Sequence, residues 1–236
     1  LLPAGAAWLT AAFFAVHPVH VEAVANVVGQ PEIVVTLLQI MAVAWYASAR
    51  RKGPLSAGPI LGIAVIYAVS CLTKESGVVL PGLLVLAELT LVASAEPPAH
   101  RLVRLAPLFG ALALIGAGYL LTRSLVLGGL VGEYPNPALR DVGFGTRVLT
   151  MLAVVPQWWR LLLLPWHLQA DYMPLEIDRA TTFGVAQGLG LLVLLGWAFA
   201  AWRARRPHPI TAFGLGWAAV TLFPVSNLLL PSGILL

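Results

Sequence analysis

The sequence predicts an all-α membrane protein whose helices cross the bilayer several times. Hydrophobic residues make up 59% of its 236 residues, and only 10% are charged. A soluble domain needs a far larger charged surface to cover such an apolar chain. Eight apolar runs approach the roughly 20 residues that a spanning helix needs, and they lie at 1–16, 31–49, 55–73, 77–93, 103–121, 148–164, 184–202 and 210–230.

Both ends of the sequence are apolar: it starts within the run 1–16 and ends in the stretch NLLLPSGILL after the run 210–230 begins. The chain begins without Met inside an apolar run and stops in another, and no secretory cleavage site follows the start. We therefore expect 1–236 to be one partial transmembrane domain of a longer protein. Cys71 is the only cysteine, so no intrachain disulfide is expected.

Basic residues set the expected orientation. They form three clusters beside apolar runs, at Arg50–Arg51–Lys52, Arg101 with Arg104, and Arg203 with Arg205 and Arg206. Such clusters favour the cytoplasmic side and anionic headgroups, so we expect lipid and no nucleic acid as partner. Residues 17–30, the turn at 74–76 and the loop 122–147 should then share the opposite side.

The run 148–164 does not fit this alternation as a crossing helix. Pro156, Gln157 and Arg160 lie near its middle, which suits an interfacial or re-entrant helix better than a lipid-exposed span. The alternative is a true crossing that places residues 203–206 outside.

Several polar clusters interrupt the runs on the non-cytoplasmic side. His17, His20 and Glu22 fall within six residues, a composition suited to metal binding, phosphate contact or proton transfer. The alternative is an interfacial loop whose histidines have all their hydrogen bonds satisfied. Lys74 and Glu75 are costly near lipid unless they pair or face water, and the ammonium could hold a phosphate. A turn with a snorkelling lysine would explain them equally.

The loop 122–147 is long for a plain connector, and we expect it to cover a substrate. Pro135 and Pro137 prevent a continuous helix through Asn136. The polar residues of this loop and of the segment after 164 include Arg123, Glu133, Tyr134, Asn136, Arg140, Asp141, Arg147, Asp171, Tyr172, Glu176 and Asp178.

Several motifs, taken in their order along the chain, resemble those of the transmembrane and tetratricopeptide-repeat O-mannosyltransferase family, and the resemblance covers nearly the whole chain. The matching pieces are HPVHVEAV from His17, Lys74–Glu75, Asn136–Pro–Ala, Thr146–Arg147–Val–Leu–Thr150, LLLLP at 161–165, Asp171–Tyr172 and Phe223–Pro–Val–Ser–Asn227. The sequence differs at Gly29–Gln30–Pro31–Glu32, where the family more usually has Gly-Arg-Ala-Asp.

The resemblance implies a glycosyltransferase with the GT-C-type helical core. Such an enzyme takes a sugar, a hexose such as mannose, from an isoprenyl-phosphate carrier to a protein or other acceptor on the non-cytoplasmic face. The expected location is a bacterial inner membrane with the site facing the periplasm. An acidic loop upstream should supply the principal base or organise a divalent metal, and peptide-binding repeats should follow downstream.

The expected residue roles follow from this resemblance and from the need to stabilise the negative charge on the phosphate leaving group. Lys74 and Arg147 are the expected phosphate contacts. The expected supporting groups are His17 and His20 as hydrogen-bond partners, Glu22, Glu75 and Asp171 as orienting carboxylates, and Asn136, Tyr172 and Asn227 in the substrate loop.

Two other classes of function are compatible with the sequence. A secondary transporter or flippase would place charges near the bilayer midplane and show repeat symmetry. A structural membrane anchor would tolerate alanine at the polar clusters.

Overall fold

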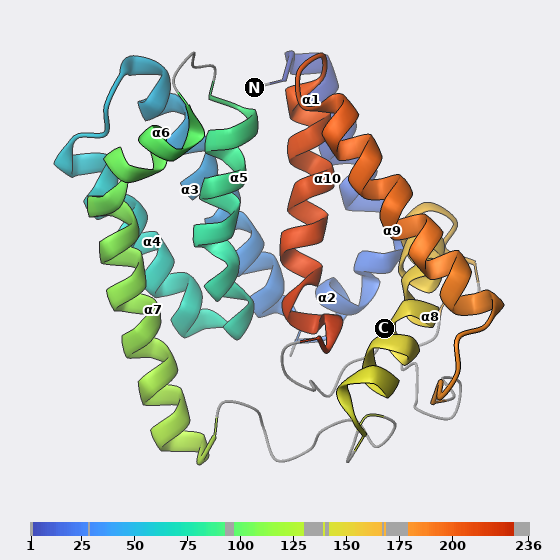
Figure 1. The fold of residues 1–236 in the computed structure, drawn as a ribbon. Coiled ribbons are helices and arrows are strands. Elements are labelled where there is room, and N and C mark those ends of the chain that lie inside the picture. Colours follow the sequence, from blue (N-terminus) through green and yellow to red (C-terminus); the bar gives the residue numbers. More distant parts are fainter. Residues whose placement is uncertain are drawn as a thin grey trace. The chain divides into compact units, whose positions relative to one another are not determined.

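The computed structural model describes residues 2–27, 29–92, 97–129, 139, 142–166, 168 and 179–228. Every regular element in these ranges is a helix (Figure 1), which confirms the all-α prediction. The α-helices are α1 (Ala4–Val16), α2 (Val21–Ala25), α3 (Gln30–Lys52), α4 (Ala57–Thr73), α5 (Leu80–Thr90), α6 (Pro98–Arg104), α7 (Ala106–Leu127), α8 (Phe144–Leu163), α9 (Val185–Ala204) and α10 (Pro209–Leu222). Short 3-10 helices are η1 (Pro18–His20), η2 (Glu75–Val79) and η4 (Pro224–Ser226).

The chain forms two compact units, each built from separate stretches of sequence. The first unit contains residues 1–30, 133–198 and 225–236, and the second contains 31–132 and 199–224. The first therefore holds α1, α2, α8 and most of α9, whereas the second holds α3 to α7 and α10.

Membrane-spanning character is concentrated in a few of these helices. Within the described residues α3, α7 and α9 are each long and apolar enough to cross a bilayer, and α1 with the bent continuation to Ala25 could make a fourth span. The apolar helices α4 and α10 have 17 and 14 residues. At 1.5 Å per residue α4 covers about 25 Å, slightly less than the hydrocarbon thickness. In the part of the chain that the structure describes, the fold is thus of membrane type, with fewer helices of full spanning length than the eight apolar runs suggested.

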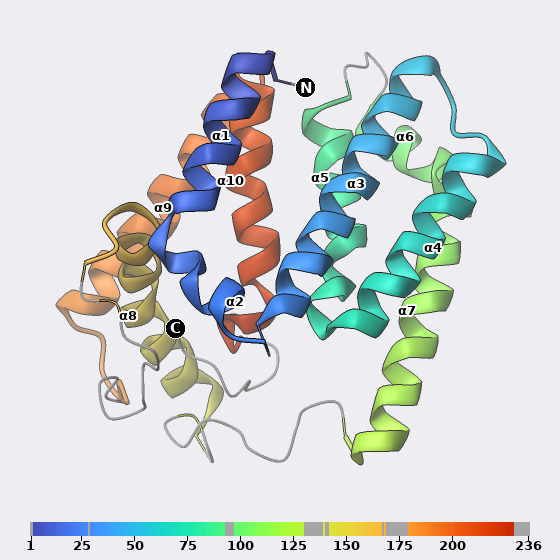
Figure 2. The ribbon, with the colours of Figure 1, turned by 180° about the vertical axis from the view of Figure 1, so that it is seen from behind.

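The core of the second unit lies among α3, α4, α5 and α7, which Figures 1 and 2 show from opposite sides. Small residues let the helices approach closely, as is common in membrane bundles. A Cβ at Gly116 would lie 2.8 Å from the Tyr67 hydroxyl, and a Cβ at Gly216 would lie 2.6 Å from the Leu86 side chain. These contacts join α7 to α4 and α10 to α5.

The second unit has two polar ends separated by about one membrane thickness. Glu32 and Arg50 lie 18 residues apart on α3, which corresponds to about 27 Å along the helix axis. Lys74 lies at the Glu32 end, since the two side chains form an ion pair. Arg101 lies at the Arg50 end, because both arginines contact Glu88.

The third basic cluster also belongs to the Arg50 end. Gly82 of α5 faces Val220 of α10, and Leu86 faces Gly216, so the two helices run antiparallel. The beginning of α10, and with it the preceding residues 203–206, therefore lies beside the end of α5 that carries Glu88. All three basic clusters gather at one end of this unit, and the turn 74–76 lies at the other, as the positive-inside rule requires.

In the first unit α8 and α9 cross while running in the same sense. The Gln187 amide donates to the Leu149 carbonyl at 3.4 Å, and the Trp159 and Trp197 rings meet edge to face with centroids 5.0 Å apart. Gly190 lies so close to Leu152 that an added Cβ would overlap its carbonyl oxygen. The contacts occur in the same order along both helices.

This shared direction bears on whether α8 crosses the membrane. The segment that connects α8 to α9 carries Asp171, Glu176 and Asp178 in its sequence, too many charges to return through hydrocarbon. Of the two helices, only α9 is long and apolar enough by composition to span a bilayer. The interfacial or re-entrant placement of 148–164 stays a prediction.

Three helix boundaries differ from the sequence predictions. The helix α7 continues to Leu127, so Arg123 is helical and does not belong to the predicted loop from 122; Gly128 then ends the helix with a φ of 71°. Helix α6 starts at Pro98, five residues before the apolar run predicted from 103. The run from 77 begins as the 3-10 helix η2 before α5.

Candidate functional site

The turn between α4 and η2 carries the predicted residues Lys74 and Glu75, and it is fixed to the start of α3. Lys74 Nζ lies 2.9 Å from Glu32 Oε1, while the Ser76 hydroxyl donates to Glu32 Oε2 at 2.7 Å. The buried Gln39 donates from Nε2 to the Ser76 carbonyl at 3.0 Å. Both carboxylate oxygens of Glu32 thus hold the same turn.

A glycine makes this turn tight. A Cβ at Gly77 would lie 2.5 to 2.6 Å from backbone atoms of Ser70 and Cys71. Backbone atoms of a packed helix cannot give way as the end of a flexible side chain can, so only glycine fits here. The chain therefore folds back against α4, and this close return positions Lys74 and Glu75 at the end of the second unit.

A second ionic contact reaches the turn from α7. Arg123 Nη1 lies 3.8 Å from Glu75 Oε2, and it also lies 3.5 Å from the Tyr119 hydroxyl. Glu75 is largely exposed, with 61% of its side-chain surface accessible. This contact is looser than the Lys74–Glu32 pair.

The helices α4 and α7, together with the turn after α4, line an open cleft of about 510 Å³. Its walls are mainly apolar and include Leu72 of α4 and Ile115 and Val126 of α7, whereas Lys74, Glu75 and Arg123 lie at its polar end. The volume falls in the range of small-ligand sites. An apolar cleft with ionic groups at one end suits an amphipathic anion.

In the first unit His17 is committed to backbone hydrogen bonds. Its Nδ1 accepts from the Val19 N–H at 3.3 Å, which leaves the proton on Nε2 to donate to the Leu162 carbonyl at 3.1 Å. The ring is buried, with 9% of its surface exposed. This arrangement matches a satisfied histidine that joins the end of α1 to the last turn of α8.

His20 packs beside its neighbours and is not drawn into a ligand cluster. Its ring centroid lies 4.0 Å from that of Phe14 and 5.7 Å from that of His17. The side chain of Glu22 lies outside the described part of the structure. Among the described residues, no group of three or more His, Cys, Asp or Glu side chains could hold a metal ion.

Arg147 and Asn227, which the sequence singled out separately, lie close to one face of α8. Arg147 Nη2 is 3.4 Å from the Leu228 carbonyl, and the buried Asn227 amide contacts Met151 Sδ at 3.5 Å. Asn227 adopts a φ of 58°, uncommon for a residue other than glycine. The role of Arg147 in phosphate binding stays a prediction, as does that of Asn227 in the substrate loop. Asn136, Asp171 and Tyr172 lie outside the described residues.

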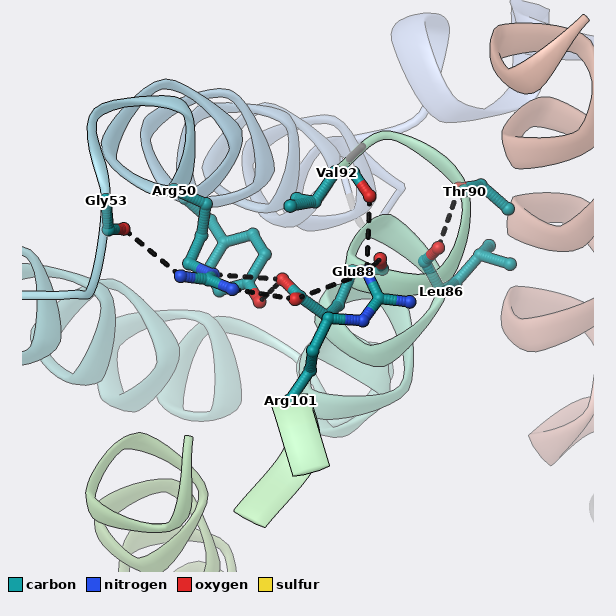
Figure 3. A network of polar contacts seen from close by, with 8 residues as sticks. Arg50, Gly53, Leu86, Glu88, Thr90, Val92 and Arg101 are labelled. Atoms are coloured by element: carbon teal, nitrogen blue, oxygen red, sulfur yellow. Dashed lines mark hydrogen bonds and ion pairs between the residues drawn. The ribbon is translucent and has the colours of Figure 1, made fainter. Parts of the chain in front are cut away.

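The sequence reasoning missed a buried ionic cluster at the other end of the second unit (Figure 3). Glu88 is fully buried, and its Oε2 accepts from the Tyr46 hydroxyl at 2.6 Å. Arg50 binds both oxygens, at 2.8 and 3.1 Å, while Arg101 Nη1 donates to the Glu88 carbonyl at 2.9 Å. A lone carboxylate in an apolar run signals such a partner, because an unpaired charge there is costly.

Glu32 was also absent from the predicted site residues. It stands where the resembling family usually has Asp, and the structure gives that carboxylate a defined task in holding Lys74 and Ser76. Arg123 was assigned only to a loop, and its place beside the cleft depends on the extra turns of α7.

Comparison with known proteins gives partial similarity to several proteins named protein O-mannosyl-transferase. The human protein O-mannosyl-transferase TMTC4 is 27% identical over 94% of this chain, which corresponds to 34% of that protein. The mouse protein O-mannosyl-transferase TMTC1 is 36% identical over 33% of this chain and 9% of its own length, and the human TMTC1 is 34% identical over a similar share.

The chain spans about a third or less of the length of these relatives. No protein-family model matches the chain, and no solved structure matches it. The sequence resemblance is therefore supported by relatives that carry the name protein O-mannosyl-transferase, at low identity and over part of their length.

Proposed function

We propose that this chain is part of a GT-C-type membrane glycosyltransferase. The enzyme would move a hexose such as mannose from an isoprenyl-phosphate carrier to a protein acceptor on the non-cytoplasmic face. Similarity to protein O-mannosyl-transferases supports mannose as the sugar and a protein as the acceptor. The observation that carries the proposal is the anchored ionic turn 74–76 beside an apolar cleft at one end of a membrane-type helical unit.

The chemistry requires cations where this turn supplies them. In the transfer the bond between sugar C1 and a phosphate oxygen breaks, and the acceptor hydroxyl oxygen bonds to C1. The hydroxyl proton passes to a base, which we expect upstream of residue 1. Negative charge grows on the departing phosphate in the transition state. Positioned cations such as Lys74 and Arg123 stabilise this transition state more than they stabilise the bound substrate.

The rival transporter function is disfavoured by the placement of charge. In the described part of the second unit, the ion pairs of Glu88 with Arg50 and Arg101, of Lys74 with Glu32 and of Arg123 with Glu75 lie near the two ends of α3, about 27 Å apart. A transport path would place ionisable groups near the midplane. An enzyme that acts on an interfacial headgroup needs them at one end, as found here.

Transfer of radiolabelled mannose tests the proposal directly. Purified full-length protein in proteoliposomes should transfer mannose from an isoprenyl-phosphate mannose to a peptide acceptor, and Lys74→Met should slow transfer about 10-fold or more. Arg51→Met, at the opposite end of α3, is the matched control and should keep the wild-type rate. No transfer by the wild-type protein, or an undiminished rate in Lys74→Met, would contradict the proposal.

A further inference from the structure

The two cations beside the cleft differ in how firmly they are already paired. Lys74 Nζ lies 2.9 Å from Glu32 Oε1, a full ion pair whose carboxylate is held in place by Ser76. Arg123 meets Glu75 at 3.8 Å and the Tyr119 hydroxyl at 3.5 Å, the outer limits of direct contact. The charge of Lys74 is thus compensated within the protein, whereas that of Arg123 is only weakly compensated by these described partners.

The guanidinium of Arg123 is also the better phosphate ligand in its chemistry. It presents five N–H donors in a planar fork that can bind two phosphate oxygens at once. Its side chain is 25% exposed at the polar end of the cleft. Glu75, at 61% exposure, is free to turn away when an anion takes its place.

The apolar walls of the cleft indicate what must be attached to the anionic head of the ligand. Leu72 and Val126 line it and are 81% and 75% exposed. In a membrane protein such side chains face hydrocarbon, so a lipid chain can enter sideways from the bilayer without first crossing water. The ligand must combine this chain with an anionic head that reaches Arg123.

We infer that the cleft between α4 and α7 holds the hydrocarbon chain of an isoprenyl phosphate, and that Arg123 is the main protein contact to its phosphate. The choice of an isoprenyl chain over a bilayer phospholipid rests on the proposed function. Lys74 is then the weaker of the two phosphate contacts, because Glu32 already pairs with it.

Binding of farnesyl phosphate to the full-length protein in nanodiscs tests this inference separately from sugar transfer. Native mass spectrometry or a thermal-shift titration would measure the affinity. Arg123→Ala should weaken binding about 10-fold or more, since hydrogen bonds to a charged group are lost. Arg123→Lys should fall between wild type and Arg123→Ala, because the charge remains without the fork.

A second pair of variants tests the cleft without touching a charge. Gly118 lines the cleft, and nothing lies within 4 Å of a Cβ placed there. Gly118→Leu should therefore fold normally while occupying the space of the chain, and should weaken farnesyl phosphate binding about 10-fold. Gly110→Leu is the matched control, since Gly110 lies on the same helix with equal room and is not among the residues that line the cleft.

The outcomes separate the alternatives. Binding that depends on Arg123 and Gly118 supports the inference even if no mannose is transferred, a result that would refute only the proposed function. Unchanged affinity in both Arg123→Ala and Gly118→Leu overturns the inference. Equal competition by phosphatidylglycerol would overturn the isoprenyl assignment, and equal competition by inorganic phosphate would show that the cleft contributes nothing.

Discussion

Replacing Glu88 with alanine is expected to lower the free energy of unfolding by about 3–5 kcal/mol. The side chain is fully buried, and both Arg50 and Arg101 approach it. Removing the carboxylate leaves two guanidinium groups in a poorly solvated place with no compensating charge, which costs far more than the intact cluster gains. Chemical or thermal unfolding of the full-length protein in detergent or nanodiscs would measure the change.

Two companion variants identify the cause. Glu88→Gln keeps the shape but removes the charge, so it should reproduce most of the loss. Thr90→Ala lies two residues further on, where the hydroxyl donates only to the Leu86 carbonyl of its own helix, and should change stability by less than about 1 kcal/mol. A Glu88→Ala protein as stable as Thr90→Ala would show that the cluster adds little to the fold.

A single methyl group at Gly190 is expected to separate α8 from α9. The added Cβ would lie nearer to the Leu152 carbonyl than any real contact allows, and the neighbouring carbonyl carbon would be 2.7 Å away. Backbone cannot swing aside, so the helices must move apart and lose the contact between Trp159 and Trp197. We expect Gly190→Ala to cost about 3 kcal/mol or more, the upper part of the range for overpacked sites.

The control for this substitution lies six residues along the same helix. Nothing is within 4 Å of a Cβ at Gly196, so Gly196→Ala should be neutral or stabilising by up to ~1 kcal/mol, because alanine favours helix more than glycine. Unfolding midpoints with tryptophan fluorescence as a second readout would compare the two. Equal stability of Gly190→Ala and Gly196→Ala would exclude a close crossing at Gly190.

The sequence predicted the helices well because apolar runs of membrane length leave few alternatives to helix. Their ends were harder to place. The helix α7 was expected to stop near 121, yet it continues through Thr122 and Arg123 to Leu127. Thr122 can donate to the carbonyl of Gly118 within the helix, and Arg123 reaches Glu75 beside it. The true stop is the left-handed backbone at Gly128.

The site was partly predictable for the same reason. Lys74 and Glu75 stood out as charges between two apolar runs, and the structure gives both of them ionic partners. Those partners could not be read from the sequence, because Glu32 is 42 positions before Lys74 and Arg123 is 48 positions after Glu75. Pairings over such separations are set by helix packing and not by local pattern.

His17 shows the opposite case. A histidine near a second histidine and a glutamate suggested a reactive cluster, with a satisfied interfacial histidine as the alternative. In the structure both ring nitrogens contact backbone groups: Nε2 bonds to the Leu162 carbonyl of α8, and Nδ1 accepts from the nearby Val19 N–H. The same polar pattern occurs in catalytic sites and at helix ends, where side chains form hydrogen bonds with backbone groups. Only the geometry distinguishes these two roles.

Sidedness is the central claim, and labelling of single cysteines in intact cells measures it most directly. In full-length protein with Cys71→Ser and no other cysteine, Glu75→Cys and Lys52→Cys would mark the two ends of the second unit. We predict that a membrane-impermeant maleimide labels Glu75→Cys in intact cells and labels Lys52→Cys only after permeabilisation. Labelling of both from the same side, or of Lys52→Cys alone, would contradict a transferase site that faces away from the cytoplasm.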